Sequence, residues 1–233
     1  MNKIAAIVLL SLGMASAHAV PIVFTSSTYT TFALADVDGV TGGPDSATAI
    51  LPSGTLPIKS SASVVAGGGP ADADAFADSL FLSASTGANS TGGLVSADAV
   101  TTLFGTFITP GGLLSLLVDF KDTTITGEAG LAGSTLAVSL AVDGTSLFDQ
   151  SFSSTQLIKN DFLVPAGLVG ELEISLTSFA SSSVGGDAAS NLATASFAAS
   201  VVPEPAPLAL FLGGLGLLGL SRLNREFGAR AAL

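Results

Sequence analysis

The fold class is clearest at residues 136–144, which read LAVSLAVDG. The large apolar residues of this stretch occupy alternate positions, with small or polar residues between them. Because successive side chains of a β-strand point to opposite faces, the alternation predicts a strand with one buried face. Asp143-Gly144 follows directly, and Asp-Gly is a preferred turn pair. The stretch therefore predicts a β-hairpin that returns through Leu147 to Phe152.

The same alternation recurs at Leu116/Val118/Phe120 and at residues 172–176, which read LEISL. Turn signals separate these runs: Pro110-Gly111-Gly112, Gly127, Gly130, Gly133, Pro165-Ala166-Gly167 and Gly185-Gly186. Short strands at roughly even spacing are typical of an antiparallel β-sandwich or jelly roll. We therefore predict an all-β fold, with a β-sandwich domain over residues 20–200.

Three further stretches of the central region carry local predictions. Residues 109–112 (TPGG) and 164–167 (VPAG) look alike, and we interpret each as a tight turn that feeds a core strand, rather than as an internal repeat. The Ala/Ser-rich stretches 60–66 and 190–200 should pack the sheets closely or lie at sheet edges. Residues 36–57 contain so many Gly and Pro that they predict a long surface loop.

Composition excludes several classes of protein. The 233 residues include no cysteine and one histidine, His18, so the body of the protein lacks Ser-His-Asp, Cys-His and His/Cys zinc sites. The central region carries three lysines against sixteen acids, a net charge of −13 within a chain whose formal charge is −11. Such a body repels the phosphate backbone, so we expect no nucleic-acid partner.

The amino-terminal residues 1–19 have the pattern of a secretory signal peptide. Lys3 precedes an apolar run from Ile4 to Met14, and the small residues Ala17 and Ala19 form an A-x-A site. We expect cleavage after Ala19, which would remove His18.

The carboxyl-terminal residues 201–233 combine three features. Pro203-Glu204-Pro205 lies in a proline-rich linker, because proline fixes φ and disfavours helix before it. An apolar stretch follows from Leu208 to Leu220, and even when counted from Ala206 to Ser221, about sixteen residues, it has a marginal length for a single transmembrane helix.

Arg222 and Arg225 close this apolar stretch. By the positive-inside rule they stay in the cytoplasm as membrane-stop residues, so the body before Pro203 lies on the export side of the inner membrane. An ordinary tail anchor is the alternative interpretation.

Together, Pro203-Glu204-Pro205, the Leu/Gly-rich stretch and the terminal arginines resemble the PEP-CTERM sorting signal of exported bacterial proteins. The resemblance covers about thirty terminal residues. It implies processing by an exosortase, transient residence in the inner membrane, and delivery to the cell envelope surface or the extracellular matrix. The family is associated with bacteria that make exopolysaccharide.

Candidate chemistry in the body rests on carboxylates. Asp36/Asp38 and Asp72/Asp74, with Asp78 beyond, have a spacing that can chelate Ca²⁺, but neither pair completes an EF-hand, so solvated surface acids are the favoured interpretation. No other cofactor is indicated.

Glu171 and Glu173 are the candidates for a glycosidase pair, although their spacing places both on one solvated strand face. Residues 89–91 (NST) match the N-glycosylation pattern and predict a loop. Phe104 and Phe107, with Val100 and Ile108, predict core packing.

These observations favour a non-enzymatic, exported protein with a structural or adhesive role linked to exopolysaccharide and biofilm. The alternative is a lectin-like carbohydrate-binding module, in which Ca²⁺ could bridge the polysaccharide to the aspartates. A carboxylate-pair glycosidase is the third hypothesis.

Overall fold

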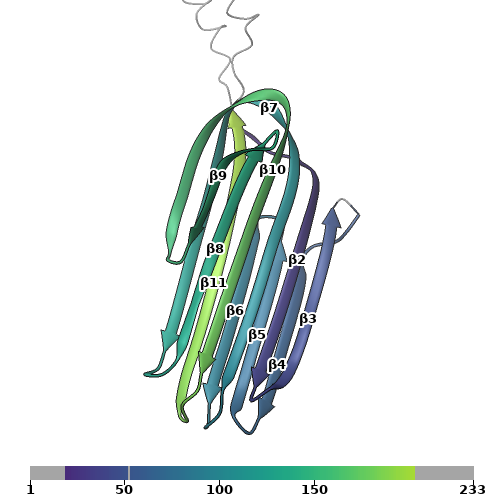
Figure 1. The fold of residues 1–233 in the computed structure, drawn as a ribbon. Helices are drawn as coiled ribbons and strands as arrows, with labels where there is room; N and C mark the ends of the chain where they lie inside the picture. Colours follow the sequence, from purple (N-terminus) through teal and green to yellow (C-terminus); the bar gives the residue numbers. More distant parts are fainter. Residues whose placement is uncertain (1–18, 52, 203–233) are drawn as a thin grey trace, which may run out of the picture.

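A computed structural model describes residues 19–51 and 53–202 of the chain (Figure 1). Within these residues the chain forms strands and no helix. The strands are β1 (Val20–Pro21), β2 (Phe24–Val37), β3 (Val40–Leu51), β4 (Ile58–Ala66), β5 (Gly69–Asp78), β6 (Phe81–Ser90), β7 (Val95–Thr126), β8 (Leu131–Val142), β9 (Thr145–Phe152), β10 (Gln156–Ser182) and β11 (Asp187–Val202).

Two long strands, β7 and β10, belong to both layers of the molecule. They pair with each other along nearly their whole lengths, and each bends midway. The first half of β7 and the second half of β10 form one sheet, in the order β3-β2-β7-β10-β8-β9. The other halves form a second sheet, in the order β4-β5-β6-β11-β7-β10. All of these pairings are antiparallel, so the predicted antiparallel β-sandwich is confirmed.

The bends of β7 and β10 coincide with the two look-alike stretches. Pro110 is the register partner of Ala166, and the register shifts between Ala166 and Val169. Gly111, Gly112 and Gly167 have positive φ, which glycine adopts without steric cost. Each stretch does feed a core strand, but neither reverses the chain. They are the two sides of one corner, where a strand pair passes from the first sheet to the second in a jelly-roll-like wrap.

Other predictions of the central region are confirmed strand by strand. The hairpin of residues 136–152 is β8 and β9, joined at Asp143 and Gly144, whose φ values of 50° and 71° give the turn that matches strand twist. The alternating residues on β7, β8 and β10 are buried: Leu116, Val118, Phe120, Leu136, Val138, Leu140, Leu172, Ile174 and Leu176.

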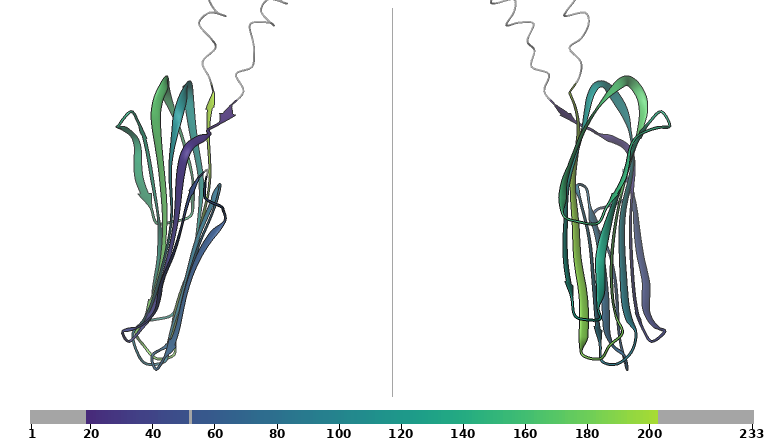
Figure 2. Two further views of the ribbon diagram at one scale, coloured as in Figure 1. Left: turned by 90° about the vertical axis from the view of Figure 1, so that its right-hand side faces the viewer. Right: turned by 60° about the vertical axis from the view of Figure 1, so that its left-hand side comes forward.

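The core changes character along the length of the sandwich. Near the corner it contains large side chains, such as Leu114, Phe107 and Phe120, whereas toward the opposite end alanines face one another across the sheets, including Ala33 on β2 and Ala75 on β5. Figure 2 shows the two sheets closer together at that opposite end. Small side chains permit this closer approach, because the gap between two sheets is set by the side chains that fill it.

The two Ala/Ser-rich stretches have different positions. Residues 60–66 lie in β4, an edge strand of the second sheet, as one part of the prediction expected. Residues 190–200 lie in β11, between β6 and β7, so they pack inside the sheet.

The predicted surface loop over residues 36–57 is wrong. β2 continues to Val37, and β3 occupies Val40–Leu51, paired to β2. The breakers are tolerated because β3 is an edge strand, where Pro44 removes no hydrogen bond to a second neighbour. At Gly42, an added Cβ would collide with the backbone of Ser63 on β4, so the glycine allows β3 and β4 to approach at the side of the sandwich.

Both described chain ends lie at the corner end of the sandwich. Val20 of β1 is the register partner of Val201 of β11 (Figures 1 and 2). The expected transmembrane helix, the sorting motif Pro203-Glu204-Pro205, the basic residues Arg222 and Arg225, and Ala17 of the signal cleavage site lie outside the described residues. Residues 19–51 and 53–202 include no helix that is long and apolar enough to cross a bilayer.

Candidate functional site

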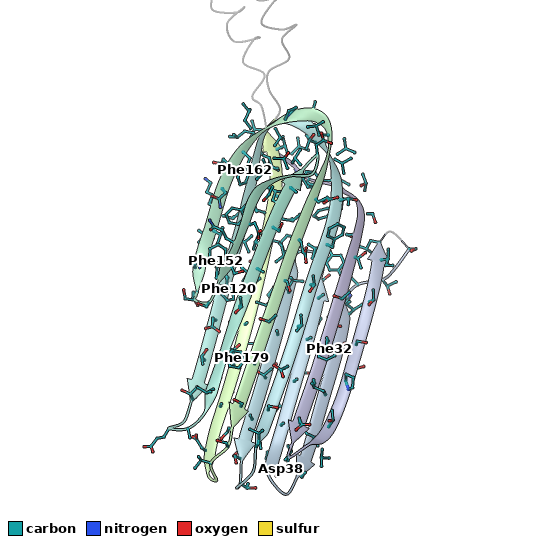
Figure 3. All side chains as sticks on the ribbon, in the orientation of Figure 1. Phe32, Asp38, Phe120, Phe152, Phe162 and Phe179 are labelled. Carbon is teal, nitrogen blue, oxygen red and sulfur yellow. The ribbon has the colours of Figure 1, made fainter. Side chains whose placement is uncertain are left out.

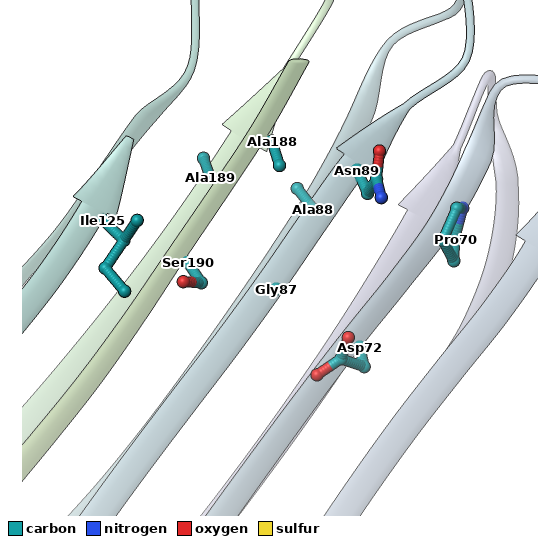
Figure 4. Close-up of a pocket in the computed structure, with 9 residues that line it drawn as sticks. All are labelled: Pro70, Asp72, Gly87, Ala88, Asn89, Ile125, Ala188, Ala189 and Ser190. Carbon is teal, nitrogen blue, oxygen red and sulfur yellow. The ribbon is translucent and has the colours of Figure 1, made fainter. Parts of the chain in front are cut away.

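A groove crosses the outer face of the second sheet near the end opposite the corner (Figure 4). It has a volume of about 290 Å³ and is formed by four strands. Gly87, Ala88, Ala188 and Ala189 contribute backbone or a single methyl group to its lining, and the remaining lining residues are Pro70, Asp72, Asn89, Ile125 and Ser190. We call this feature the Asp72 groove.

The strand register explains how distant residues meet in the Asp72 groove. Asp72 of β5 is paired with Gly87 of β6, Gly87 with Ser190 of β11, and Ser190 with Ile125 of β7. These four residues therefore form one row across the sheet, about 4.8 Å apart at each step. Because the row joins four strands that are separate in the sequence, no local motif could have revealed it.

Gly87 is the residue that gives the groove its depth. A Cβ at this position would lie 2.7 Å from Oδ1 of Asp72, so the carboxylate lies over the bare glycine backbone. Among the described residues, the side chains of Asp72, Asn89 and Ser190 make no hydrogen bond to another protein group. The groove therefore presents a carboxylate, an amide and a hydroxyl that are all free to bind a ligand.

The two aspartates of β5 have opposite electrostatic environments. Partial burial, and then the nearby charge of Asp74, raise the pKa of Asp72. The pKa of Asp74 is lowered, first by the hydrogen bond from Ser61 and then by Lys59, whose Nζ lies 3.0 Å from Oδ1 of Asp74. Asp74 is thus occupied by protein partners, and Asp72 is the member of the pair that is available to a ligand.

The acids at the turn between β2 and β3 have structural partners. Asp36 accepts hydrogen bonds from the backbone N–H of Gly39 (3.0 Å) and the hydroxyl of Thr41 (3.1 Å). Asp38, labelled in Figure 3, accepts one from the backbone N–H of Leu94 (2.8 Å). Their carboxylates therefore hold the turn and the neighbouring loop. Across the described residues, no group of three or more acids, histidines or cysteines is arranged to hold a metal ion.

Glu171 and Glu173 lie on the outer face of the first sheet, as their spacing predicts. Both are exposed on β10, and Leu172 between them is buried. A shallow depression of about 200 Å³ beside Glu173 also includes Asp149 of β9. Asp149 and Glu173 both flank Ser139 of β8, so register brings together two carboxylates that the sequence did not connect.

Aromatic residues on this first face correct one prediction. Phe107 is buried, as expected, but Phe104 is 40% exposed and Ile108 is 52% exposed, so they are not core residues. Each lies an odd number of positions from Phe107 along the strand. Side chains an odd number of positions apart point to opposite faces, so Phe104 and Ile108 point outward. Phe32 and Phe179 lie on the same face (Figure 3), which gives the first sheet a partly aromatic outer surface.

Asn89 and Ser90 also differ from the prediction of a loop. Both belong to β6, and Ser90 is buried, with its hydroxyl donating to the carbonyl of Gly93 (2.7 Å). Asn89 is exposed at the end of the Asp72 groove.

No protein-family model and no curated protein matches this chain. Among solved structures, TmCBM61 in complex with β-1,4-galactotriose is similar with 12% identity and a TM-score of 0.25, over 60% of this chain and 80% of that one. The Schizosaccharomyces pombe Cnp3 cupin domain gives 10% identity and a TM-score of 0.15, over 65% and 77%. The infectious bursal disease virus Gx strain structure gives 12% and 0.20, over 90% and 76%. At such TM-scores, the matches assign neither a family nor a ligand to this chain.

Proposed function

We propose that this protein is an exported surface or extracellular-matrix protein that binds exopolysaccharide in the Asp72 groove and has an adhesive, non-enzymatic role. The observation that carries the proposal is the row of Asp72, Gly87, Ser190 and Ile125, with Asn89 at its end. The row places free hydrogen-bonding groups beside apolar surface on a rigid sheet.

The chemistry of the groove suits a sugar chain. Carboxylate, amide and hydroxyl groups together donate to and accept from sugar hydroxyls. The side chains of Ile125 and Pro70 supply apolar surface for the C–H faces of a sugar ring. The groove is open to solvent, so a polymer can continue beyond it in both directions.

The charge of the body restricts the class of polysaccharide. With sixteen acids against three lysines, the body repels polymers rich in uronic acids. One of these acids, Asp72, lies in the groove itself. We therefore propose a neutral polysaccharide, or one that contains amino sugars, as the ligand.

Delivery to the surface is the second part of the proposal. The signal peptide of residues 1–19, Pro203-Glu204-Pro205 and the terminal arginines support export, transient insertion in the inner membrane and processing by an exosortase. Intact-mass analysis of protein from the envelope and the medium should show loss of residues 1–19 and truncation near Pro203. Mature protein with a full-length carboxyl terminus would contradict exosortase processing and favour a permanent tail anchor.

Titration calorimetry against the organism's own exopolysaccharide tests the binding proposal. We expect Asp72→Asn to weaken binding at least tenfold, because a hydrogen bond to a charged group contributes about 1.5–3 kcal/mol. Gly87→Ala should weaken it too, since the added Cβ displaces the Asp72 carboxylate. Asp161→Asn, an exposed acid of β10 outside the groove, is the matched control and should bind normally.

The outcomes separate the proposal from its alternatives. Absence of heat and of retention on the polymer would overturn carbohydrate binding and leave a purely structural role. Binding that appears only with added Ca²⁺ would favour metal bridging through the aspartates. Polymer cleavage that Glu171→Gln or Glu173→Gln abolishes would favour the glycosidase.

A further inference from the structure

The corner end of the sandwich is apolar at its surface. Five large apolar side chains of β7, β10 and the segment before β2 are exposed there: Val23 (80%), Ile108 (52%), Leu113 (42%), Leu163 (73%) and Val169 (47%). We call this set the apolar cap. Ile108 is the register partner of Val169, and Leu113 is the register partner of Leu163, so exposed apolar side chains adjoin one another there. Clustered exposed apolar surface of this kind marks an interaction site.

The positions of the charged residues also distinguish the apolar cap from the rest of the body. The segments that build the cap, residues 19–35, 103–118 and 162–170, contain no charged residue. Charges border these segments at Asp143, which is exposed in the β8–β9 turn and whose backbone N–H donates to the carbonyl of Val169 (2.8 Å), and at the sequence neighbours Asp161 and Glu171.

Exposed apolar side chains also occur at the far end, so they alone do not distinguish the apolar cap. Val65 (78% exposed) and Ile125 (66% exposed) lie there, but carboxylates such as Asp38 and Asp72 stand among them. The segments that form the cap therefore differ from the far end in carrying no charged residue of their own.

An apolar depression continues the cap along one side of the sandwich. It has a volume of about 600 Å³, and its apolar lining includes Ile22, Val23, Phe24, Leu51 and Leu80. The uncharged surface thus extends below the corner, alongside the start of β2.

The chain itself connects the apolar cap to the tail. Val202, the last described residue of β11, is the register partner of Leu113 in the cap. The sequence reaches the apolar stretch that begins at Leu208 after only five further residues, 203–207. The six steps from Val202 to Leu208 span at most about 22 Å, so the cap cannot lie far from the start of that stretch.

We propose that the apolar cap is a membrane-contacting surface, which rests in the interfacial region of the bilayer while the tail holds the precursor. The inference rests on the proposed function, because the tail brings the cap to the lipid. The uncharged segments of the cap let an acidic body approach headgroups that its carboxylates would otherwise avoid, and buried apolar area stabilises the contact. The long axis then stands away from the membrane, with the Asp72 groove at the distal end.

Single-cysteine labelling tests this orientation directly, because the chain contains no cysteine. The full chain is reconstituted in phosphatidylcholine vesicles that contain nitroxide-labelled lipid, with an environment-sensitive fluorophore at one position. Leu163→Cys reports on the cap, and Val65→Cys, equally exposed at the other end, is the matched control. Leu215→Cys reports on the tail.

We expect blue-shifted emission and at least about threefold stronger quenching for the Leu163 label than for the Val65 label. Ile108→Asp with Val169→Asp should abolish that difference while the tail label stays quenched, and far-ultraviolet circular dichroism checks that this variant is folded. Equal, weak quenching at Leu163 and Val65 with a quenched Leu215 label would overturn the inference and leave the proposed function intact. An unquenched Leu215 label would instead contradict the membrane-held precursor of the proposed function.

Discussion

Pro110 of β7 and Ala166 of β10 are register partners at the point where both strands leave the first sheet for the second. An added Cβ at the neighbouring Gly111 would lie 2.8 Å from the Cβ of Ala166. The similarity of residues 109–112 and 164–167 therefore reflects a bend that two paired strands make together. Each strand needs glycine there, because the backbone of each enters the left-handed region.

The corner predicts a difference between two glycines with the same backbone angle. Gly111 and Gly167 both have φ of +81°, but only Gly111 has a neighbour within 4 Å of an added Cβ. Gly167→Ala should cost about 1 kcal/mol from backbone strain alone, and Gly111→Ala should cost more because of the contact with Ala166. Urea unfolding of the two variants measures the difference. Equal losses would show that the corner opens to accommodate the methyl group.

The two zones of the core predict opposite responses to side-chain size. Leu116→Ala, in the zone of large side chains, should lower the free energy of unfolding by about 2–5 kcal/mol through a cavity. Ala75→Leu, where the sheets are close, should lower the free energy of unfolding by about 1–3 kcal/mol through overpacking. Leu163→Ala is the exposed control and should change stability little. A stabilised Ala75→Leu variant would contradict the close approach of the sheets.

A buried hydrogen-bond network near the far end carries a further prediction. Asn191 donates to Oδ1 of Asp122 (2.6 Å) and to Thr124 (2.9 Å), and it accepts from Ser178 (2.7 Å), which contacts Thr86 (2.9 Å). Asn191 is 3% exposed, so Asn191→Ala should cost about 1–3 kcal/mol by removing three hydrogen bonds from a buried network. Asn191→Asp should be worse, since it brings a second carboxylate to Asp122. Thermal unfolding of both variants checks the order.

The two aspartates of β5, Asp72 and Asp74, should change the pH dependence of stability in opposite directions. Burial raises the pKa of Asp72, so its ionised form costs stability above the ordinary value of about 3.9. Asp72→Asn should therefore raise the melting temperature at pH 7, and the gain should disappear as the pH falls below that value. The pKa of Asp74 is lowered, so its stabilisation is present at pH 7 and is lost as the pH falls through the lowered pKa.

Asp74→Asn should accordingly lower stability at pH 7, by less than about 1 kcal/mol, because its partner Lys59 is largely exposed. Melting temperatures from pH 2 to pH 7 distinguish the two variants. Shifts of the same sign at pH 7 would contradict the assignment of Asp72 as the desolvated member of the pair.

Much of the fold could be predicted because burial on one face leaves a period of two in the sequence. The hairpin at Asp143-Gly144 and the buried residues of β7, β8 and β10 all follow from that rule. Pairing between strands that are far apart in the sequence leaves no periodic pattern. The partnership of Pro110 with Ala166 and the row from Asp72 to Ile125 depend on register between strands tens of residues apart.

The wrong predictions also concern the position of a residue within a strand or of a strand within a sheet. Residues 36–57 contain many Gly and Pro residues, which would disrupt a central strand. The edge strand β3 tolerates them, because it hydrogen-bonds to β2 and has a free edge. Phe104 and Ile108 were grouped with Phe107 because all are large and apolar, yet position along the strand, not size, decides which face each side chain occupies. The sequence shows Asp72 and Asp74 as neighbours on one segment, but only the register shows that Asp72 faces Gly87.

One strand, β11, runs from the Asp72 groove to the point where the chain continues toward the tail. Ala188, Ala189 and Ser190 line the groove, and Val202 ends the strand beside Leu113. In the proposed function, a pull between bound polymer and anchored tail would therefore be transmitted lengthwise through a single segment of backbone. Because β6 and β7 flank it on both sides, that tension acts as shear on two ladders at once, which must rupture together before the strand slides free.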